Sequence, residues 1–467
     1  MEEAIVLYTI PAMGHLKPIL ELGKLILTHQ PSLSIHIIII SASQTTTVSI
    51  SSYISQVATT IPSIKVHHLP STNHETKIFE VIRLSNSLLH QTLLSISKSY
   101  SINALIIDFF CVASLSVVAQ LNIPAYFFYS ACAGSLALTL YLPVIHQNNT
   151  TFKDRSAFLD VPGLPPIKLS DLPKPVLDRS GDVYESFLDV AVGLPKSSGI
   201  IINTFEFLES REVKAILDGL GLPKGNAISP IYCVGPLIET MNLTDGGHEI
   251  EYLTWLESQP SQSVIFLCFG SLGRFEKKQL REIAIGLERS GQRFLWVVRN
   301  PPSNNQILAL STEPEPDLDS LLPKGFVDRT RERGLVVKSW ATQVAVLNHS
   351  SVGGFVTHCG WNSVLEAVCA GVPMVAWPLY AEQKINIELL VEEMKIALPI
   401  IGSENGFVTA LEVEERVCEL MGSEAGNAVR EKANDMKNAA KAAVGEGGSS
   451  RGALSRFIEA WKKLLNF

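Results

Sequence analysis

Residues 340–383 combine residue types that suit the binding of a phosphate group. A strand-like run at 353–357 leads into a turn that contains Gly360, and a helical run at 362–370 follows. Glycine lets the backbone approach a ligand closely. A helix that opens directly after a strand points free N–H groups and a positive dipole end at the space above it. This stretch therefore predicts an anion-binding turn.

Four polar side chains of the stretch have candidate ligand groups, an anion for three of them and a ribose for the fourth. His358 ends the strand-like run, and Asn362 and Ser363 lie where the helix opens, so all three can contact an anion there. Glu366 lies one helical turn after Asn362 on the same face. Because it is a carboxylate, it suits a pair of ribose hydroxyls better than a phosphate.

The two ends of the stretch offer groups for a base and for a sugar. Trp340 presents a flat apolar face to a base, and Glu382 and Gln383 can hydrogen-bond to sugar hydroxyls. Base, ribose, diphosphate and sugar thus each have a candidate partner. An ordinary βαβ unit with a glycine-rich turn is the alternative interpretation, since such turns are common.

A histidine and an aspartate distant in the sequence each follow a predicted strand. His15 comes after the strand 4–9, at the start of a helix whose positive end favours a neutral imidazole. Asp108 ends the strand 103–107, and ligands bind at the carboxyl ends of such strands. If the two side chains meet, Asp108 can orient His15 as a general base. The alternative is an Asp that caps a helix and a His on the surface.

The whole stretch 340–383 resembles the nucleotide-sugar signature of plant family 1 glycosyltransferases, which move a sugar from a UDP-sugar to a small lipophilic acceptor. The resemblance rests on H-C-G-W-N-S at 358–363, a Glu three residues later, and an acidic residue followed by Gln at the end. One position departs from the family pattern, since Thr342 stands where the family usually has Pro. The change is expected to loosen the turn under Trp340 without removing a ligand-contacting side chain.

The resemblance implies a role for each of sixteen residues. His15, in a P-x-x-G-H stretch, corresponds to the base, and Asp108, in D-F-F-C, to its partner. Trp361 and Gln383 accompany the use of UDP-glucose in the family. The implied UDP-sugar contacts are Gly14, Ser271, Trp340, Ala341, Gln343, His358, Gly360, Trp361, Asn362, Ser363, Glu366, Tyr380, Glu382 and Gln383.

Two successive sets of alternating strands and helices must position these residues. Such alternation in 467 residues predicts two doubly wound α/β domains. The resemblance implies the GT-B arrangement, in which two Rossmann-like domains face each other across a cleft. We expect an acceptor-binding domain at 1–240 and a UDP-sugar-binding domain at 252–445, with a C-terminal helix at 453–467 that packs back on the first domain.

Three segments look less regular. The Ser/Thr-rich segment 41–60 is expected to be a mobile surface region, and the Pro-rich segment 161–179 to be irregular. Residues 235–251 have the composition of a linker.

Composition and charge narrow the classes of partner. The formal net charge is −8 and the basic residues are scattered, which argues against nucleic acid and acidic membranes. The acidic N-terminus lacks a secretory signal, and no apolar run reaches the length of a membrane span. Seven cysteines without a C-x-x-C pair are read as reduced thiols. We therefore expect a cytoplasmic protein. We also expect it to be a monomer.

No metal or cofactor is expected. Asp317 and Asp319 form a D-x-D pattern, but they lie in an acidic, Pro-broken loop and are read as solvated residues. His349 and His358 lack the close helical spacing of a metal pair.

The prediction is an inverting transfer of glucose from UDP-glucose to a phenolic small molecule such as a flavonoid, isoflavone or chalcone, with His15 as base and Asp108 as its partner. The acceptor pocket is expected near Phe109, Phe110, 127–129 and 177–187. Two alternatives remain for the reaction, namely attack through a ring carbon and the use of a different UDP-sugar donor. A UDP-sugar-binding protein without activity is a third alternative, but His15 and Asp108 argue against it because such a protein needs no base. A nucleotide-dependent oxidoreductase is a further alternative. The chain lacks the G-x-G-x-x-G motif after a first strand that such an enzyme would carry, which weighs against it.

Overall fold

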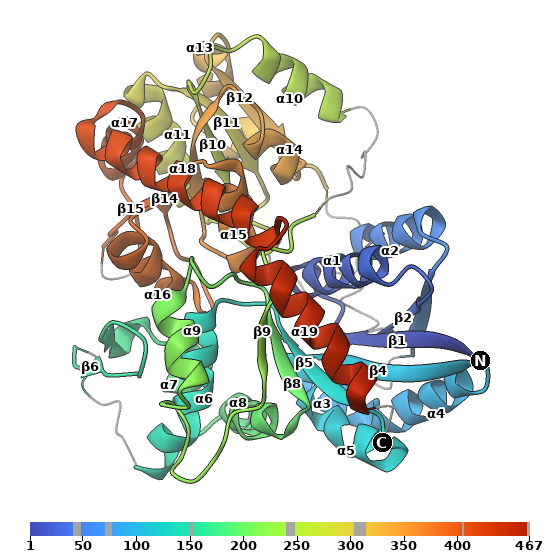
Figure 1. The fold of residues 1–467 in the computed structure, drawn as a ribbon. Coiled ribbons are helices and arrows are strands. Elements are labelled where there is room, and N and C mark those ends of the chain that lie inside the picture. The colour runs from blue at the N-terminus through green and yellow to red at the C-terminus, as the bar shows by residue number, and fades with distance from the viewer. Residues whose placement is uncertain are drawn as a thin grey trace. The chain divides into compact units, whose positions relative to one another are not determined.

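Two α/β units, each built on a parallel β-sheet, make up the chain (Figure 1). The computed structural model describes residues 1–40, 48–70, 77–148, 154, 156–239, 248–302, 314–403 and 406–464. Unit 1 comprises residues 1–240 and 442–467, and unit 2 comprises residues 241–441. Strands alternate with helices in both units, which confirms the predicted class of two Rossmann-like domains.

The main sheet of unit 1 has seven parallel strands in the order β3-β2-β1-β4-β5-β8-β9. These strands are β1 (Glu2–Thr9), β2 (Ser34–Ile40), β3 (Ile64–Leu69), β4 (Tyr100–Asp108), β5 (Ala125–Tyr129), β8 (Gly199–Ile202) and β9 (Ile231–Cys233). A separate antiparallel pair joins β6 (Phe158–Leu159) to β7 (Ile167–Lys168).

The helices of unit 1 cover both faces of this sheet, with α1 and α2 on one face and α4 and α5 on the other (Figure 1). They are α1 (Met13–His29), α2 (Val48–Thr60), α3 (Ile78–Leu84), α4 (Asn86–Ser97), α5 (Leu115–Leu121), α6 (Ala133–Gln147), α7 (Lys174–Leu177), α8 (Asp182–Gly193), α9 (Ser210–Leu217) and α19 (Ser449–Leu464). A sheet covered on both faces explains why β2 reads SIHIIII, an almost continuous apolar run.

Unit 2 has a six-stranded parallel sheet in the order β12-β11-β10-β13-β14-β15. Its strands are β10 (Val264–Cys268), β11 (Arg293–Val298), β12 (Gly334–Lys338), β13 (Val352–Thr357), β14 (Met374–Ala376) and β15 (Ala397–Pro399). Its helices are α10 (His248–Glu257), α11 (Lys277–Ser290), α12 (Leu318–Leu321), α13 (Phe326–Thr330), α14 (Gln343–Leu347), α15 (Trp361–Ala370), α16 (Gln383–Glu388), α17 (Ala410–Gly422) and α18 (Glu424–Val444). One core cluster joins α11 and α17 to the sheet.

The Ser/Thr-rich segment 41–60 was wrongly predicted as a mobile region over most of its length. Residues 41–47 lie outside the described part of the chain, but 48–60 form α2. This helix buries Ile50, Tyr53, Ile54 and Val57, which recur at the helical spacing of three and four residues. The hydroxyl-rich composition concealed that apolar face. Strand β3 was missed for a related reason, since its alternation is interrupted by polar side chains.

The Pro-rich segment 161–179 contains only short elements, namely β7, a 3₁₀ turn at Leu169–Asp171 and α7. It is nevertheless anchored, because it buries six apolar side chains, those of Val161, Leu164, Ile167, Leu169, Leu172 and Val176. In the segment 235–251, residues 240–247 lie outside the described part, and 248–251 open α10 instead of continuing a linker.

The last helix, α19, belongs to unit 1 although it ends the chain. It lies beside β9 and β4 (Figure 1), and the ring of Phe457 contacts Tyr126 at 4.9 Å and Tyr232 at 5.4 Å between centroids. Trp461, which is fully buried, packs against Phe457 at 4.8 Å. Aromatic burial therefore fastens the C-terminus to the sheet of unit 1.

A buried carboxylate holds the start of α6. Glu209 is 1% exposed and accepts hydrogen bonds from the backbone N–H groups of Ala133 at 2.9 Å and Gly134 at 3.0 Å. These are two of the N–H groups that a helix leaves unpaired at its N-terminus. Burial raises the pKa of Glu209 from 4.5 to about 7, against the opposing effect of these hydrogen bonds.

We expect this carboxyl group to make the protein less stable as the pH rises from about 4.5 to about 7. Unfolded chains release the proton at the lower pH and folded chains keep it to the higher one, so the free energy of unfolding falls by roughly 3 kcal/mol at about 1.4 kcal/mol per pH unit. Glu209→Gln removes this contribution. Urea unfolding of both proteins at pH 5 and pH 8 measures it, and an equal loss in the two would contradict the assignment.

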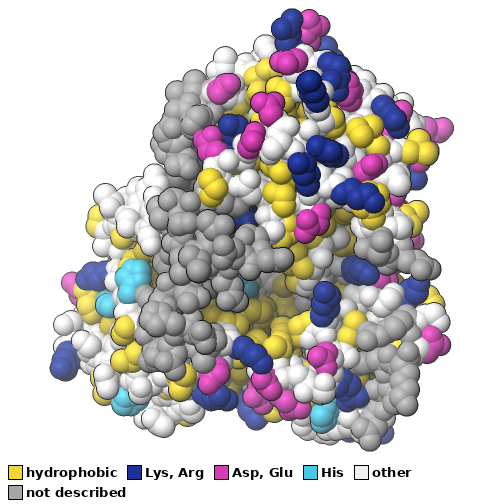
Figure 2. Space-filling model, turned by 180° about the vertical axis from the view of Figure 1, so that it is seen from behind, with side chains coloured by type: hydrophobic (Ala, Val, Ile, Leu, Met, Phe, Trp, Pro, Cys, Tyr) yellow, Lys and Arg dark blue, Asp and Glu magenta, His cyan; other side chains and the backbone are white. Residues whose placement is uncertain are grey.

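Acidic and basic side chains are mixed over the face seen in Figure 2. This face shows no broad basic stripe of the kind that attracts a nucleic-acid backbone. Within the described part of the chain, none of the helices has both the length and the apolar character needed to span a membrane.

Candidate active site

His15 and Asp108, 93 positions apart, meet at the carboxyl ends of β1 and β4 in unit 1. His15 is the third residue of α1, and its Nδ1 lies 2.7 Å from Oδ2 of Asp108, the last residue of β4. Asp108 is fully buried, and its Oδ1 accepts a hydrogen bond from the backbone N–H of Phe110 at 3.0 Å. Because both carboxylate oxygens are engaged, the carboxylate is fixed and in turn orients the imidazole.

Two aromatic rings pack against the imidazole of His15. Its centroid lies 5.5 Å from that of Phe109 and 4.8 Å from that of Phe110. Phe110 also contacts Phe79 of α3 at 5.2 Å and Phe187 of α8 at 5.7 Å. Sequence reasoning anticipated apolar walls near 109–110 and 177–187, but it missed Phe79. Nothing in the sequence relates α3 to His15.

The predicted UDP-sugar contacts other than Gly14, which precedes His15 in unit 1, all lie in unit 2. Most of them sit on loops that leave the carboxyl ends of its strands. Ser271 follows β10, Trp340 follows β12, and the turn 358–360 follows β13. Helix α15 opens with Trp361, Asn362 and Ser363, so its free N–H groups face the same edge of the sheet. The structure therefore gathers the candidate anion contacts at one edge of this sheet.

His358 is held between two glycines. A Cβ atom on Gly270 would lie 2.6 Å from the His358 ring, and one on Gly360 would lie 2.5 Å from its Nε2, both too short for a real contact. Gly270 also has a φ of +69°, which disfavours other residues. Burial lowers the pKa of His358 from 6.5 to about 4, so its imidazole is neutral near pH 7 and can donate one hydrogen bond.

A hydrogen-bonded group joins α14 to α15. Gln343 Nε2 donates to Ser363 Oγ at 2.9 Å and to Glu366 Oε2 at 2.5 Å. Glu366 is 9% exposed, so these bonds fix a nearly buried carboxylate. Nearby, Trp340 is 44% exposed, whereas Ala341 beside it is buried. An exposed indole suits stacking on a base, and a fixed carboxylate suits hydrogen bonds to a ribose.

The loop that closes the signature is held by Gln383. Its Oε1 accepts hydrogen bonds from the backbone N–H groups of Leu379 at 2.8 Å and Tyr380 at 3.0 Å, and the residue is 2% exposed. Tyr380 lies 6.0 Å from His358 between ring centroids, and Glu382 occupies the N-cap position of α16 without a capping hydrogen bond from its side chain. Gln383 thus has a structural task in addition to the sugar contact predicted for it.

Backbone strain marks three positions in this site. Six described residues other than glycine have a positive φ, and three of them, Ser339 at 65°, Cys359 at 62° and Ala381 at 54°, directly adjoin predicted UDP-sugar contacts. The carbonyl of Cys359 accepts a hydrogen bond from Asn386 Nδ2 at 2.8 Å. Such strained residues persist only where the surroundings hold them, and they cluster at binding sites.

Tyr252 of α10 supports the turn in which the family's usual Pro is absent. Its hydroxyl accepts a hydrogen bond from the Thr342 N–H at 2.9 Å and donates one to Thr342 Oγ1 at 3.0 Å. Tyr252 is 4% exposed, so these bonds are shielded from water. The turn under Trp340 is therefore pinned from α10, which corrects the expectation that it is loose.

We expect Tyr252→Phe to weaken UDP binding about three- to tenfold, because each net hydrogen bond contributes roughly 0.5–1.5 kcal/mol. Isothermal titration with UDP measures the change. The matched rescue is the double variant with Thr342→Pro, since the φ of −71° at Thr342 already suits proline. UDP affinity equal to wild type in the single variant would show that Tyr252 does not support the site.

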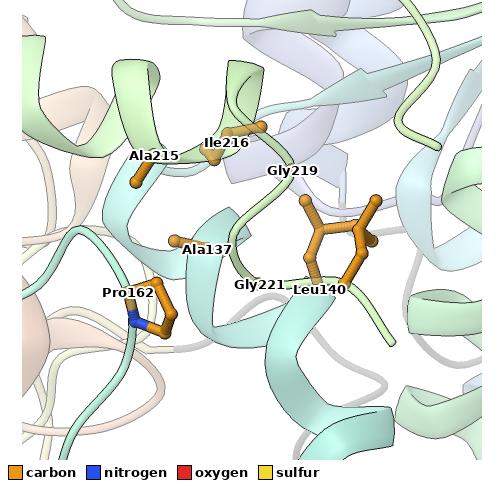
Figure 3. A pocket seen from close by; sticks show the side chains of 8 residues that line it. Ala137, Leu140, Pro162, Ala215, Ile216, Gly219 and Gly221 are labelled. Carbon is orange, nitrogen blue, oxygen red and sulfur yellow. The ribbon is translucent and has the colours of Figure 1, made fainter. Parts of the chain in front are cut away.

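An apolar hollow on unit 1 is a different kind of feature. Figure 3 shows aliphatic side chains around it, and its lining consists of Ala137, Leu140, Pro162, Ala215, Ile216, Gly219, Gly221 and Leu222. No titratable group and no predicted site residue lines it. It offers packing between α6 and α9 but no chemistry.

Among the residues that the structure describes, no group of three or more His, Cys, Asp or Glu side chains is placed to hold a metal ion. The D-x-D residues Asp317 and Asp319 are exposed at the start of α12. All seven cysteines are free thiols.

Comparisons with known proteins identify the family. Residues 240–414 match the family model described as "UDP-glucoronosyl and UDP-glucosyl transferase". An anthocyanidin 5,3-O-glucosyltransferase of a Rosa hybrid cultivar is 49% identical over 99% of both chains. A phloretin 2'-O-glucosyltransferase of Pyrus communis is 46% identical, over 98% of this chain and all of the relative. The structure of Phytolacca americana UGT2 with UDP-2fluoro-glucose and pterostilbene has a TM-score of 0.86 at 34% identity, covering 98% of this chain and 100% of that one. The chain therefore belongs to the UDP-glucuronosyl and UDP-glucosyl transferase family and is a UDP-glycosyltransferase of the GT-B fold.

Proposed function

We propose that this enzyme transfers glucose from UDP-glucose to a phenolic hydroxyl with inversion at the anomeric carbon, and that His15 is the general base. The observation that carries the proposal is the 2.7 Å contact between His15 Nδ1 and the fully buried Asp108. A carboxylate in this position holds the Nδ1–H tautomer, which leaves Nε2 as the ring nitrogen that takes a proton.

In the proposed reaction the acceptor hydroxyl loses its proton to His15 Nε2 as its oxygen attacks the anomeric carbon. The new C–O bond forms on one face of the sugar while the bond to the UDP oxygen breaks on the other, so the centre inverts. Asp108 stabilises the imidazolium that results. UDP leaves with the electron pair of the broken bond.

We assign the acceptor to the domain 1–240, the C-terminal helix 453–467 included, and the UDP-sugar to the domain 252–445. On the donor side, Trp340 stacks on the base and Glu366 binds the ribose. The neutral His358, Ser271 and the N–H groups of α15 contact the diphosphate. These groups stabilise the leaving UDP by hydrogen bonds, so we propose that no metal or other cofactor takes part. Trp361, Tyr380, Glu382 and Gln383 complete the sugar site.

The aromatic rings around His15 support a flat acceptor. Phe79, Phe109, Phe110 and Phe187 offer apolar faces to an aromatic ring system while one hydroxyl reaches the base. Relatives named for anthocyanidin and phloretin, and the neighbour bound to pterostilbene, point to the same chemical class. We propose a flavonoid, isoflavone, chalcone or similar phenol. The protein is proposed to act as a monomer in the cytoplasm.

The testing experiment is one incubation of purified protein with UDP-glucose, EDTA and a panel of flavonoids, chalcones and simple phenols. We expect UDP release and a product heavier by one hexose. Fragmentation of that product separates an oxygen-linked from a carbon-linked glucose. Product with another UDP-sugar but none with UDP-glucose would overturn only the choice of donor. UDP binding without product from any donor would make the protein a binding module.

A further inference from the structure

The proposed UDP-sugar contacts contain no Lys or Arg. They include two carboxylates, those of Glu366 and Glu382, and His358 is neutral near pH 7 because burial lowers its pKa to about 4. A nucleoside diphosphate nevertheless brings at least two negative charges. Hydrogen bonds from charged donors to such groups are about twice as strong as neutral ones. A cation beside these groups, from outside the signature 340–383, would add to the hydrogen bonds that hold the diphosphate.

Arg299 follows β11 and lies at the carboxyl edge of the sheet of unit 2. Its Nη1 donates hydrogen bonds to the carbonyl oxygens of Gly270, at 3.4 Å, and of Ser271. Arg299 is half-buried. The guanidinium therefore holds the turn between β10 and α11 by hydrogen bonds. One of these bonds is to Ser271, whose side chain is proposed to contact the diphosphate.

The same turn packs on His358, and this places the guanidinium within the donor site. A Cβ atom at Gly270 would lie 2.6 Å from the His358 ring. Burial raises the pKa of Tyr380 to about 12, and the charge of Arg299 is one of the smaller effects that oppose this rise. Arg299, the turn 270–271, His358 and Tyr380 thus form one contiguous group.

We propose that Arg299 is a positioning residue of the donor site, one that holds the 270–271 turn in place and supplies positive charge beside the diphosphate of UDP-glucose. This inference rests on the proposed function. Guanidinium suits the task because it is always charged and presents several donors in one plane. It can engage the turn carbonyls and still act on an anion next to them.

The test compares the binding of UDP and of uridine, which lacks the diphosphate, to wild type, Arg299→Gln and Arg299→Lys by isothermal titration. We expect Arg299→Gln to weaken UDP binding roughly ten- to a hundredfold while uridine binding stays within about twofold. Arg299→Lys restores the charge but not the planar fork, so it should recover part of the UDP affinity.

Arg333→Gln is the matched control. Arg333 is also half-buried and donates to backbone carbonyls of unit 2, those of Leu287, Gln292 and Glu288. Arg333 directly precedes β12, whereas Arg299 directly follows β11, and these two strands are parallel neighbours. The two arginines therefore lie at opposite ends of the strands. Replacement of Arg333 should lower the melting temperature and leave the ratio of UDP to uridine affinity unchanged.

The outcomes separate this inference from the proposed function. If wild type binds UDP and Arg299→Gln binds UDP equally well, or loses UDP and uridine affinity in equal proportion, Arg299 has no role toward the diphosphate. If wild type binds neither nucleotide, the proposed function fails and this inference fails with it.

Discussion

Alanine at position 15 is expected to lower kcat for glucose transfer by roughly 10²- to 10⁴-fold, the usual contribution of a general base. His15 is the one imidazole in direct contact with the buried Asp108, at 2.7 Å, among the residues described. Without it, the phenol must lose its proton to water before or during attack. UDP-glucose binding should persist, because almost all proposed donor contacts belong to unit 2.

Single-turnover assays with saturating UDP-glucose measure this loss, and a UDP titration shows whether the donor site is intact. His29→Ala is the matched control, because His29 lies on the same helix and its Nδ1 lies 3.0 Å from the carbonyl oxygen of Leu25, one turn earlier. The control should retain nearly full activity. A His15→Ala enzyme within tenfold of wild type would mean that another group accepts the proton.

Gly360→Ala is expected to weaken UDP binding by about a hundredfold. The new methyl carbon would lie 2.5 Å from His358 Nε2 and 3.1 Å from Cε1. His358 cannot move away easily, because it is 6% exposed and Gly270 also packs against its ring. Loss of the hydrogen bond that His358 is proposed to donate to the diphosphate costs roughly 1.5–3 kcal/mol, which reaches about a hundredfold at its upper end.

Backbone strain does not contribute to this effect. Gly360 has φ −61° and ψ 136°, a conformation that alanine adopts readily, so the contact with His358 alone is tested. Gly422→Ala in the same unit is the control, since no heavy atom lies within 4 Å of its added carbon. UDP titration and melting temperature should separate the two variants. Equal UDP affinity in Gly360→Ala and wild type would place the diphosphate away from His358.

The fold could be predicted from the sequence because its signals are strong and local. Buried strands such as β2 read as apolar runs, and the strand–helix alternation appears twice. The failures were local too. Helix α2 has its apolar face among hydroxyl side chains, so its composition resembled a loop although its spacing was helical.

The candidate site was only partly predictable. The stretch 340–383 carries its own signature, and His15 and Asp108 follow recognisable strands. Tyr252, Arg299 and Asn386 could not be found in this way, because each acts on a backbone group of a residue at least 27 positions away. No spacing rule relates such a side chain to the carbonyl or N–H group that it holds.

The position of α19 has a consequence for protein synthesis. Unit 1 comprises 442–467 as well as 1–240, so all strands of its sheet are made before α19, the helix that packs on β9 and β4. At about 5–20 residues per second, the 227 residues between positions 240 and 467 take roughly 10–45 s to translate. During that time Tyr126 and Tyr232 lack the cover of Phe457. The first domain to leave the ribosome is therefore the last to finish its core.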